Sequence, residues 1–393
     1  MTNERWTQLR ADIPVFDEYA YLNTGFSAPP SRSITDAMTA WFDLELKYGP
    51  TMRFVLDDAR ESKERLRGLL ASILGAESDE VAITSSTGVG IGTVLAGLEI
   101  TPGRHFVTTS VEHVSGVVPL YQAGADSDVP VDFVPISPND THDTILERFA
   151  EVLDDRTSVV MLSEISYSTG QLFPVREITQ LAHQVGALVV IDGAQTAGHI
   201  PIDVHALGID AYSIPAQKWL CGPRGIGALY ISSDALPRVA PSIVDGSHAA
   251  EWDFSGTFAP KSDVPGKFEV SAVAPVLAAG AIHAAEQYLE SGPSAIFDRV
   301  RELNRFAERR FELIDGVTVV SPRNDESRTG LFCFRAQNLD SADLSLWLQT
   351  ERQVVCRSVR ENDVVRLSLH AFNTEEDIEQ AAIGVEQALR HGV

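Results

Sequence analysis

The sequence has 393 residues, of which 55 are acidic and 31 basic, so its formal net charge is −24. A chain of this length is expected to form two domains, or one large domain with an appendage, and its 44% hydrophobic content is that of an ordinary soluble globular protein. The negative charge argues against nucleic acid or an anionic membrane as a partner, because its long-range field repels both.

The N-terminus and the cysteines indicate the compartment. No apolar signal region follows Met1, and no apolar run approaches the length of a membrane span. Three cysteines, Cys221, Cys333 and Cys356, are too few and too scattered for a disulfide framework or a zinc site. We therefore expect a cytoplasmic protein with no metal site.

Short apolar strands alternate with helices as far as Ile231. Strands are expected at 21–25, 81–84, 105–109, 131–135, 158–162, 187–191 and 227–231, and helices within 1–20 and 34–42 and at 56–74, 89–98, 114–122, 143–153 and 175–185. Buried apolar strands separated by helices are typical of a mostly parallel sheet covered on both faces. The sequence therefore predicts an α/β fold.

The pattern loosens after Ile231. Residues 245–266 are expected to form a long loop, and its Trp252, Phe254 and Phe258 favour a wall or an interface over disorder. Helices at 274–289, 295–313, 341–351 and 374–391 and strands at 317–320, 330–336, 353–357 and 364–369 indicate a smaller α+β domain. We expect a large domain at 21–290 and a small domain made of 1–20 and 291–393.

Polar clusters follow several of the predicted strands. Residues 84–88, 110–113, 163–167 and 192–195 each stand at the carboxyl end of a strand, where parallel sheets bind their ligands. In the first cluster, Ser86, Thr87 and Gly88 precede a helix, whose free N–H groups and dipole suit an anion. A plain N-cap explains the same residues.

Lys218 is unusual in its surroundings. The chain holds few lysines, and this one is flanked by Trp219, Leu220 and Pro223 rather than by charges. Lost hydration disfavours an ammonium group, which makes such an amine a usable nucleophile. The alternative is a partly buried lysine at the edge between a strand and a loop.

Several residues match the needs of a pyridoxal phosphate site. That site needs a lysine for a Schiff base, a carboxylate beside the pyridine nitrogen, a helix N-terminus for the phosphate, a flat side chain over the ring and an arginine for the substrate carboxylate. The chain offers Lys218, Asp192, residues 86–88, His113 and Arg366 for these roles. Taken singly, Asp192 is explained equally by a helix cap, His113 by a core histidine and Arg366 by a solvated strand arginine.

Four motifs resemble one family. They are Asp192-Gly193-Ala194-Gln195, the stretch Lys218 to Gly225, Glu112-His113, and Arg366-Leu367-Ser368 with Asn373-Thr374. From about Tyr21 to the C-terminal helix the chain resembles the class V aminotransferase branch of fold-type I pyridoxal phosphate enzymes, which includes cysteine desulfurases, cystine C–S lyases and isopenicillin N epimerases. The resemblance implies a seven-stranded, mostly parallel sheet, a small-molecule amino-acid substrate, and a homodimer with its site at the subunit interface.

The same resemblance implies roles for individual residues. Lys218 and His113 are the expected catalytic residues, and His113 is also expected to stack on the cofactor ring. Gln195 is expected to hydrogen-bond the cofactor's phenolic oxygen. The expected cofactor-binding set is Lys218, Asp192, Gln195, His113, Ser86, Thr87, Gly88, Gln217 and Ser271, and the expected substrate-binding set is Arg366, Asn23 and Tyr167.

The chain also departs from the family pattern. Most relatives carry Ser-x-His before the lysine, whereas residues 215–217 read Pro-Ala-Gln, so the phosphate is held differently. Tyr167 replaces the family's asparagine near the ring. Ser271 stands where a neighbouring subunit usually sends a threonine to the phosphate, and residues 268–272 are closer to cystine lyases than to desulfurases.

The reaction is predicted from a missing residue. A desulfurase needs a loop cysteine in an Arg-x-Gly-x-x-Cys context, but residues 357–363 form a short turn without one, and Cys356 is expected in the preceding strand. We therefore expect β-elimination, with C–S cleavage of a cysteine S-conjugate or cystine. Trp252, Phe254 and Tyr167 are candidates to line the pocket for a bulky substituent, although a dimer contact explains the two loop aromatics equally well.

Other reactions need the same site. Transamination, epimerisation, and decarboxylation or oxygen-dependent deamination remain alternatives. A non-catalytic protein that binds the cofactor is disfavoured, because Lys218 and Asp192 are both present and no DNA-binding appendage accompanies them.

Overall fold

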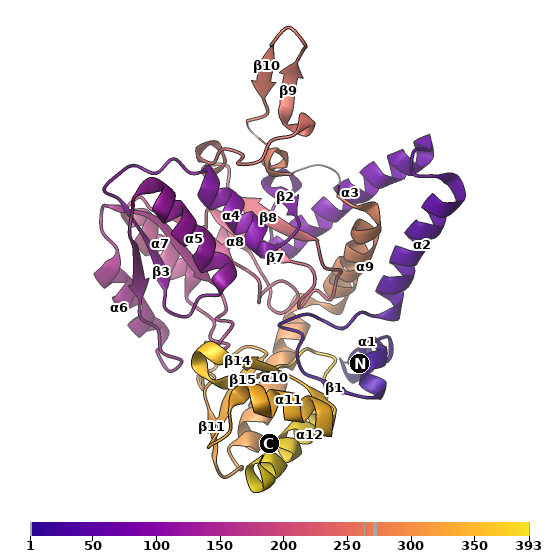
Figure 1. The fold of residues 1–393 in the computed structure, drawn as a ribbon, viewed down its shortest axis with the longest axis vertical. Helices are drawn as coiled ribbons and strands as arrows, with labels where there is room; N and C mark the ends of the chain where they lie inside the picture. The colour runs from indigo at the N-terminus through magenta and orange to yellow at the C-terminus, as the bar shows by residue number, and fades with distance from the viewer. Residues whose placement is uncertain (1, 263, 270–272, 393) are drawn as a thin grey trace.

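The computed structural model describes residues 2–262, 264–269 and 273–392 (Figure 1). Among these residues no helix is long and apolar enough to cross a membrane. The α-helices are α1 (Thr2–Ala11), α2 (Arg32–Tyr48), α3 (Arg53–Leu74), α4 (Thr87–Gly97), α5 (Val114–Ser127), α6 (His142–Val152), α7 (Val175–Gln184), α8 (Val204–Leu207), α9 (Pro275–Ser291), α10 (Pro293–Phe311), α11 (Ser341–Arg352) and α12 (Glu375–His391).

A seven-stranded sheet forms the centre of the larger part, in the order β2-β8-β7-β6-β5-β3-β4. Its strands are β2 (Val81–Thr84), β3 (His105–Thr109), β4 (Val131–Val134), β5 (Thr157–Ser163), β6 (Leu188–Asp192), β7 (Ala211–Pro215) and β8 (Gly227–Ile231). Strands β7, β6, β5, β3 and β4 are mutually parallel, whereas β8 runs antiparallel to both its neighbours. The predicted α/β architecture is confirmed.

Helices cover both faces of this sheet because its strands alternate between two apolar cores. Along β5, Val159 and Met161 pack on one side with residues of α4 and α5. Val160 and Leu162 pack on the other side with residues of α3, α6, α7 and α9. Both sets are fully buried, as expected of strands in a covered parallel sheet.

The C-terminal part is built on a four-stranded antiparallel sheet, β11-β12-β15-β14 (Figure 1). Its strands are β11 (Val317–Val319), β12 (Leu331–Ala336), β14 (Arg357–Val359) and β15 (Val364–Ser368). Phe311, Phe332 and Phe334 form an aromatic centre in its core, which α11 and α12 complete. The expected α+β character of this part is present.

Helix α10 joins the two cores. Its Ile296 and Val300 pack in the core of the large sheet, and its Leu303 and Ala307 pack in the C-terminal core. At the other end of the chain, Trp6 of α1 belongs to the first core. The division into 21–290 against 1–20 and 291–393 stays a proposal, and these shared contacts predict that the two parts unfold together.

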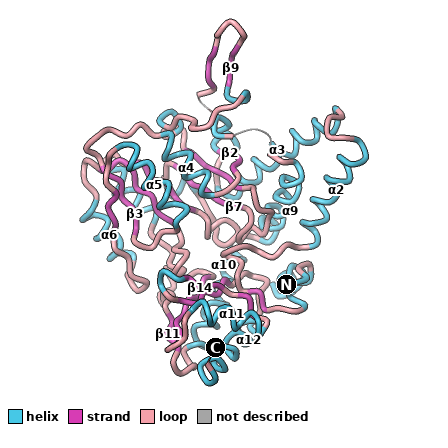
Figure 2. The backbone as a smooth tube through the Cα atoms, in the orientation of Figure 1, coloured by secondary structure: helices cyan, strands magenta, loops and turns pink. Residues whose placement is uncertain are grey.

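The stretch expected to be a loop at 245–266 contains a β-hairpin, which corrects the prediction. Strand β9 (Ala249–Trp252) pairs antiparallel with β10 (Phe258–Pro260), and the pair projects from the body at the top of Figure 2. Asp253 closes the turn by accepting hydrogen bonds from the backbone N–H groups of Ser255 and Thr257. An Asp-x-Ser-Gly turn between aromatic residues is a hairpin signal that the sequence reading missed.

Two shorter strand predictions also need correction. The strand expected at 21–25 is only β1 (Ala20–Tyr21), because the chain turns where Phe26 N–H bonds to the Asn23 carbonyl. The strand expected at 353–357 is divided into β13 (Val354–Val355), which pairs with β1, and β14, which pairs with β15. Cys356 lies between these two strands rather than within one.

Candidate functional site

The register of the large sheet brings the polar clusters to one edge. Asp192, at the end of β6, lies opposite Ser163 of β5 and Ser213 of β7. The Ser213 hydroxyl donates to the Thr87 carbonyl, which fixes the N-terminus of α4 beside this edge. A Cβ at Gly90 would lie 2.2 Å from the same hydroxyl, so only glycine lets α4 pack so closely.

Lys218 and Asp192 form the charged centre of this edge. Burial lowers the pKa of the Lys218 amine to about 8, against the opposing effect of the Asp192 carboxylate. Burial likewise raises the pKa of Asp192, although Lys218 counteracts it and the Ala194 N–H donates to Asp192 Oδ1 over 2.8 Å. An amine near pKa 8 is partly neutral at physiological pH and can act as a nucleophile or a base.

His113 caps α5 and faces Tyr167. Its Nδ1 accepts a hydrogen bond from the Ser115 N–H, so a neutral ring carries its proton on Nε2. The ring meets Tyr167 edge-to-face, with centroids 4.9 Å apart. Burial, followed by the nearby charge of Lys218, lowers the pKa of His113 to about 4, which keeps the imidazole neutral at pH 7.

Gln195 is held from two sides. Its Nε2 donates to the Gly25 carbonyl over 2.9 Å, and its Oε1 accepts from Trp219 Nε1 over 2.8 Å. A Cβ at Gly25 would lie 2.9 Å from the amide oxygen and 2.8 Å from the Ser368 hydroxyl. The glycine at which the predicted first strand breaks therefore allows this close contact.

Arg366, on β15, is buried with most of its guanidinium unpaired. Nη1 donates to the Tyr167 carbonyl over 2.7 Å, while Nε and Nη2 have no hydrogen-bond partner among the described residues. Burial lowers the pKa of this arginine to about 10. Asn23 pairs with Ser368 in an isolated bridge, two residues along β15 from Arg366, and its Oδ1 is also without a partner there.

The structure describes most, but not all, of the residues expected to bind the cofactor's phosphate. Ser86 is the N-cap of α4, and its hydroxyl accepts from the Val89 N–H, whereas the buried Thr87 hydroxyl has no partner among the described residues. Gly88 lies against Ser115 at the start of α5. Gln217 lies two residues after β7, and its amide oxygen likewise has no hydrogen-bond partner among the described residues. Ser271 lies outside the residues that the structure describes.

Trp252 and Phe254 do not join this group within one chain. They lie in the projecting hairpin, where Trp252 is 58% exposed and Phe254 is 99% exposed (Figure 1). Tyr167 instead contacts His113 and Arg366. The pocket that was expected to combine the three aromatics is therefore not formed by a single chain.

Three charged residues near the site were not predicted. Arg357 of β14 lowers the pKa values of His113 and Lys218, and its guanidinium lies 4.3 Å from the centroid of the Phe26 ring. Burial and then the Glu361 carboxylate raise the pKa of the Tyr167 phenol to about 12. Both charges lie in the stretch at 357–363, but only the folded structure shows that Arg357 acts on Lys218 and that Glu361 acts on Tyr167.

Glu112 is the third of these residues. Its carboxylate accepts from the Thr109 hydroxyl and from the Ser163 N–H and hydroxyl, which ties the residue before His113 to the end of β5. Burial raises the pKa of Glu112 to about 7. The Glu-His motif predicts a role for its histidine only; the position of the glutamate, which supports the turn before His113, follows from the fold.

The three cysteines of the sequence are buried. Burial raises the pKa of Cys356 and Cys221 to about 12 and that of Cys333 to about 11. The Cys356 thiol lies 3.6 Å from the Ser345 hydroxyl of α11. The turn that follows β14, Arg360–Asn362, is a short 3-10 segment. Since the reactive form of cysteine is the thiolate, none of the three is suited to attack.

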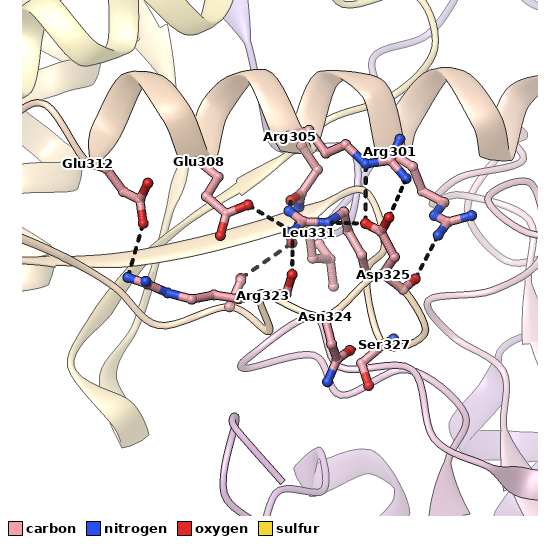
Figure 3. A network of polar contacts seen from close by, with 12 residues as sticks. Arg301, Arg305, Glu308, Glu312, Arg323, Asn324, Asp325, Ser327 and Leu331 are labelled. Carbon is pink, nitrogen blue, oxygen red and sulfur yellow. Dashed lines mark hydrogen bonds and ion pairs between the residues drawn. The ribbon is translucent and has the colours of Figure 1, made fainter. Parts of the chain in front are cut away.

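An ionic network supports the segment that carries Tyr167. Figure 3 shows Arg301 and Arg305 of α10 directed at Asp325 of the following loop. That loop in turn holds residues 169–172: the Thr329 hydroxyl donates to the Gly170 carbonyl, and the Leu172 N–H donates to Ser327. The Tyr167 carbonyl that binds Arg366 is thus fixed from the C-terminal side.

The described residues contain no group of three or more His, Cys, Asp or Glu placed to hold a metal ion.

Comparison with solved structures shows a common fold. A cystine C–S lyase, C-DES, in complex with its reaction product cysteine persulfide superposes with a TM-score of 0.89 at 24% identity, over 95% of this chain and 99% of that one. The apo cysteine desulfurase of Thermococcus onnurineus NA1 gives 0.89 at 22% identity, over 98% of both chains. These structures share the architecture of fold-type I enzymes, as the sequence predicted.

Sequence relatives extend over nearly the whole chain. A "Probable cysteine desulfurase" of Methanothermobacter thermautotrophicus is 27% identical over 395 residues, which cover 95% of this chain and 96% of the relative. A "Probable cysteine desulfurase 2" of Mycobacterium leprae is 28% identical, over 97% and 96% of the two chains. The family model for aminotransferase class V matches residues 41–381. The chain therefore belongs to the class V aminotransferase family, whose members depend on the predicted cofactor, pyridoxal 5′-phosphate.

Proposed function

We propose that this protein is a pyridoxal phosphate-dependent C–S lyase that performs β-elimination on cystine or a cysteine S-conjugate. The proteins that it resembles include desulfurases and a cystine lyase, and both kinds of enzyme act at a C–S bond. The observation that carries the choice is the state of the cysteines: all three are buried with raised pKa values. A chain without a thiolate to carry sulfur must release it with the leaving group.

The residues present fit the cofactor. Buried polar atoms without partners among the described residues, the Thr87 hydroxyl and the Gln217 amide oxygen, lie at the ends of strands β2 and β7. The buried carboxylate of Asp192 would hold a protonated pyridine nitrogen, since an opposite charge favours its ionised form. The first turn of α4 would receive the phosphate at unpaired backbone N–H groups.

When bound, pyridoxal phosphate supplies an electron sink for charge that develops at the substrate's α-carbon. Lys218 would hold the cofactor covalently through its amine and would afterwards accept the α-proton of the substrate. Its pKa of about 8 suits both tasks, because a base works best with a pKa near the working pH. His113 would cover the ring and present its Nε2–H to the departing sulfur.

Arg366 would bind the substrate's α-carboxylate. Its Nε and Nη2 are two neighbouring donors of a planar fork, which matches a carboxylate in a bidentate manner. Arg357 and Glu361 add one charge of each sign near Tyr167. Asn23 and Tyr167 lie beside Arg366 and would complete the substrate side.

The proposed reaction balances without an external oxidant. The α-carbon loses a proton to Lys218, the electron pair left behind forms the Cα–Cβ double bond, and the sulfur leaves the β-carbon with the electrons of the C–S bond. Hydrolysis of the eliminated enamine gives pyruvate and ammonium. Cystine would release cysteine persulfide, and an S-alkyl cysteine would release a thiol.

Product analysis tests the proposal. Purified holoenzyme supplied with L-cystine and with S-alkyl cysteines should form pyruvate, ammonium and the sulfur product in equal amounts. Alanine as the product of cysteine would indicate a desulfurase, and a requirement for an amino acceptor would indicate a transaminase. Solvent deuterium uptake without elimination would indicate an epimerase, and consumption of oxygen or release of carbon dioxide would indicate the remaining alternatives.

The protein is further proposed to be a homodimer that shares its active site. Exposed apolar residues lie next to the candidate site on α4 and α5: Val89, Val114, Val118 and Tyr121. Exposed apolar side chains beside a polar site favour an interface. Light scattering coupled to size-exclusion chromatography should give twice the chain mass, whereas a monomeric mass with full activity would contradict the proposal.

A further inference from the structure

The residue that follows Lys218 is bound to the expected partner of the cofactor's phenolic oxygen. Trp219 is 1% exposed, and its indole Nε1–H donates to Gln195 Oε1 over 2.8 Å. The Gln195 Nε2 donates to the Gly25 carbonyl. These two contacts determine one amide orientation, because the indole N–H only donates and the carbonyl only accepts. One Gln195 N–H is left free to donate elsewhere.

The ring of Trp219 is itself fixed by stacking. His199 lies parallel to it, with centroids 3.7 Å apart and planes at 15°. His199 Nε2 accepts from the Gly330 N–H, so its proton is on Nδ1 and is donated to the Gln195 carbonyl. The His370 ring lies nearly parallel to the Trp219 ring as well, with centroids 6.0 Å apart and planes at 23°, and its Nε2 bonds to the Trp219 carbonyl.

Both histidines are neutral in this arrangement. Burial lowers the pKa of His199 to about 3 and that of His370 to about 4. A Cβ at Gly330 would lie 2.8 Å from His199 Nε2 and 2.6 Å from the Leu369 carbonyl, so the C-terminal part fits closely around the stack. Trp219 is thus packed against His199 and close to Gly330, with its N–H directed at Gln195.

We propose that Trp219 is a positioning residue that fixes the Gln195 side chain as a hydrogen-bond donor toward the cofactor's phenolic oxygen. This role rests on the proposed function. A fixed N–H donor stabilises the ionised form of that oxygen, because hydrogen bonds to a charged acceptor are stronger than those to a neutral one. Without the indole N–H, only the bond to the Gly25 carbonyl still orients the amide, so its N–H donor is held less firmly toward the phenolic oxygen.

The test is an absorbance titration of the bound cofactor in Trp219→Phe holoenzyme. Weakening one charge-assisted hydrogen bond should raise the apparent pKa of the cofactor's absorbance transition by about one pH unit. Trp41→Phe is the matched control, because Trp41 Nε1 makes an equivalent 2.8 Å bond to Glu45 on α2. That variant should leave the titration unchanged.

A double-mutant cycle separates positioning from packing. If Trp219 acts through Gln195, Gln195→Leu alone should shift the transition, and adding Trp219→Phe should shift it no further. Additive shifts, or an unchanged titration in Trp219→Phe, overturn the role. If Trp219→Phe does not fold, replacing Trp219 by benzothienylalanine, which keeps the ring shape and lacks only the N–H donor, gives the same readout.

The outcomes distinguish this role from the proposed function. Pyruvate formation together with an unshifted titration overturns only the role of Trp219. A wild-type protein that shows no absorbance from bound cofactor overturns the proposed function and this role together.

Discussion

Two buried arginines in the C-terminal part of the chain are bound in opposite ways. Arg328 is 4% exposed and is fully paired: it bonds to Glu308 over 2.8 Å, to Asp325 over 3.1 Å, to Asn304 and to the Arg323 carbonyl. Arg366 is 1% exposed, and among the described residues its only hydrogen bond goes to the Tyr167 carbonyl.

The difference separates a structural charge from a functional one. A buried charge loses its hydration and must be compensated by partners. The partners of Arg328 lie in the chain itself, in the network between α10 and the following loop (Figure 3). Arg366 lacks such partners, and the lowered pKa of its guanidinium records the uncompensated burial. An arginine in that state is suited to a carboxylate from outside the chain.

The largest effect is expected on the structural side. Arg328→Met leaves the half-buried Glu308 without its cation and removes the hydrogen bonds to Asn304 and to the Arg323 carbonyl, which should lower the free energy of unfolding by roughly 3–5 kcal/mol. Urea denaturation measures this loss. Arg305→Met, which removes a more exposed partner of the same Asp325, should cost no more than about 1 kcal/mol. Equal losses of unfolding free energy in the two variants would show that the buried pairs of Arg328 stabilise the fold no more than the exposed pair of Arg305.

The functional arginine should show the reverse pattern. Arg366→Met removes a charge that no carboxylate of the described chain pairs with, so the stability of the apoenzyme should be unchanged or higher. Binding of the substrate carboxylate should weaken by about 2–5 kcal/mol, seen as a fall in kcat/KM. Arg335→Met, on the exposed side of β12, is the control and should retain full activity. A destabilised but active Arg366→Met would reverse the assignment.

Glu164 differs from both arginines because it is a buried acid whose side chain has only neutral partners. The Tyr212 hydroxyl donates to it, and burial raises its pKa to about 7. An acid with a raised folded-state pKa contributes stability below its unfolded pKa and loses that contribution as the pH rises through the folded value. Glu164→Gln should therefore gain roughly 2–3 kcal/mol relative to wild type between pH 5 and pH 8.5. Denaturation at both pH values measures it, and the exposed Glu351→Gln should show no such change.

Much of the large domain was predictable because its signals are local. Strand residues such as Val159 to Leu162 are apolar on both faces of the sheet. Turns such as Ser86 to Gly88 come soon after a strand in the sequence, here β2. Strand β7 was missed, since Tyr212 and Ser213 make it partly polar and Pro215 ends it. Their hydroxyls are satisfied by Glu164 and Thr87, which only the folded structure brings near.

Residues of the candidate site that belong to a sequence motif could be predicted. Residues that reach the site through contacts between distant parts of the chain could not. The motif residues lie close together: Asp192 acts on the pKa of Lys218, and Gln195 bonds to Trp219, the residue after Lys218. Their roles stay a prediction. Arg357 and Glu361 reach the same place from the C-terminal sheet, and the contact of Trp219 with Gln195 depends on a stack that includes His370. No local sequence pattern specifies these long-range contacts, because they depend on how distant segments of the chain pack together.

In the proposed reaction, sulfur leaves the enzyme without a cysteine to carry it. The most direct measurement compares Cys356→Ala with wild-type holoenzyme under identical conditions. It records the rate of pyruvate formation from L-cystine and the carbon product, pyruvate or alanine, formed from L-cysteine. Cys356 is the cysteine nearest in sequence to the turn in which desulfurases carry theirs. Equal rates, with pyruvate as the carbon product of both proteins, are predicted. Formation of alanine from L-cysteine by the wild type, and its loss in Cys356→Ala, would contradict the proposed elimination.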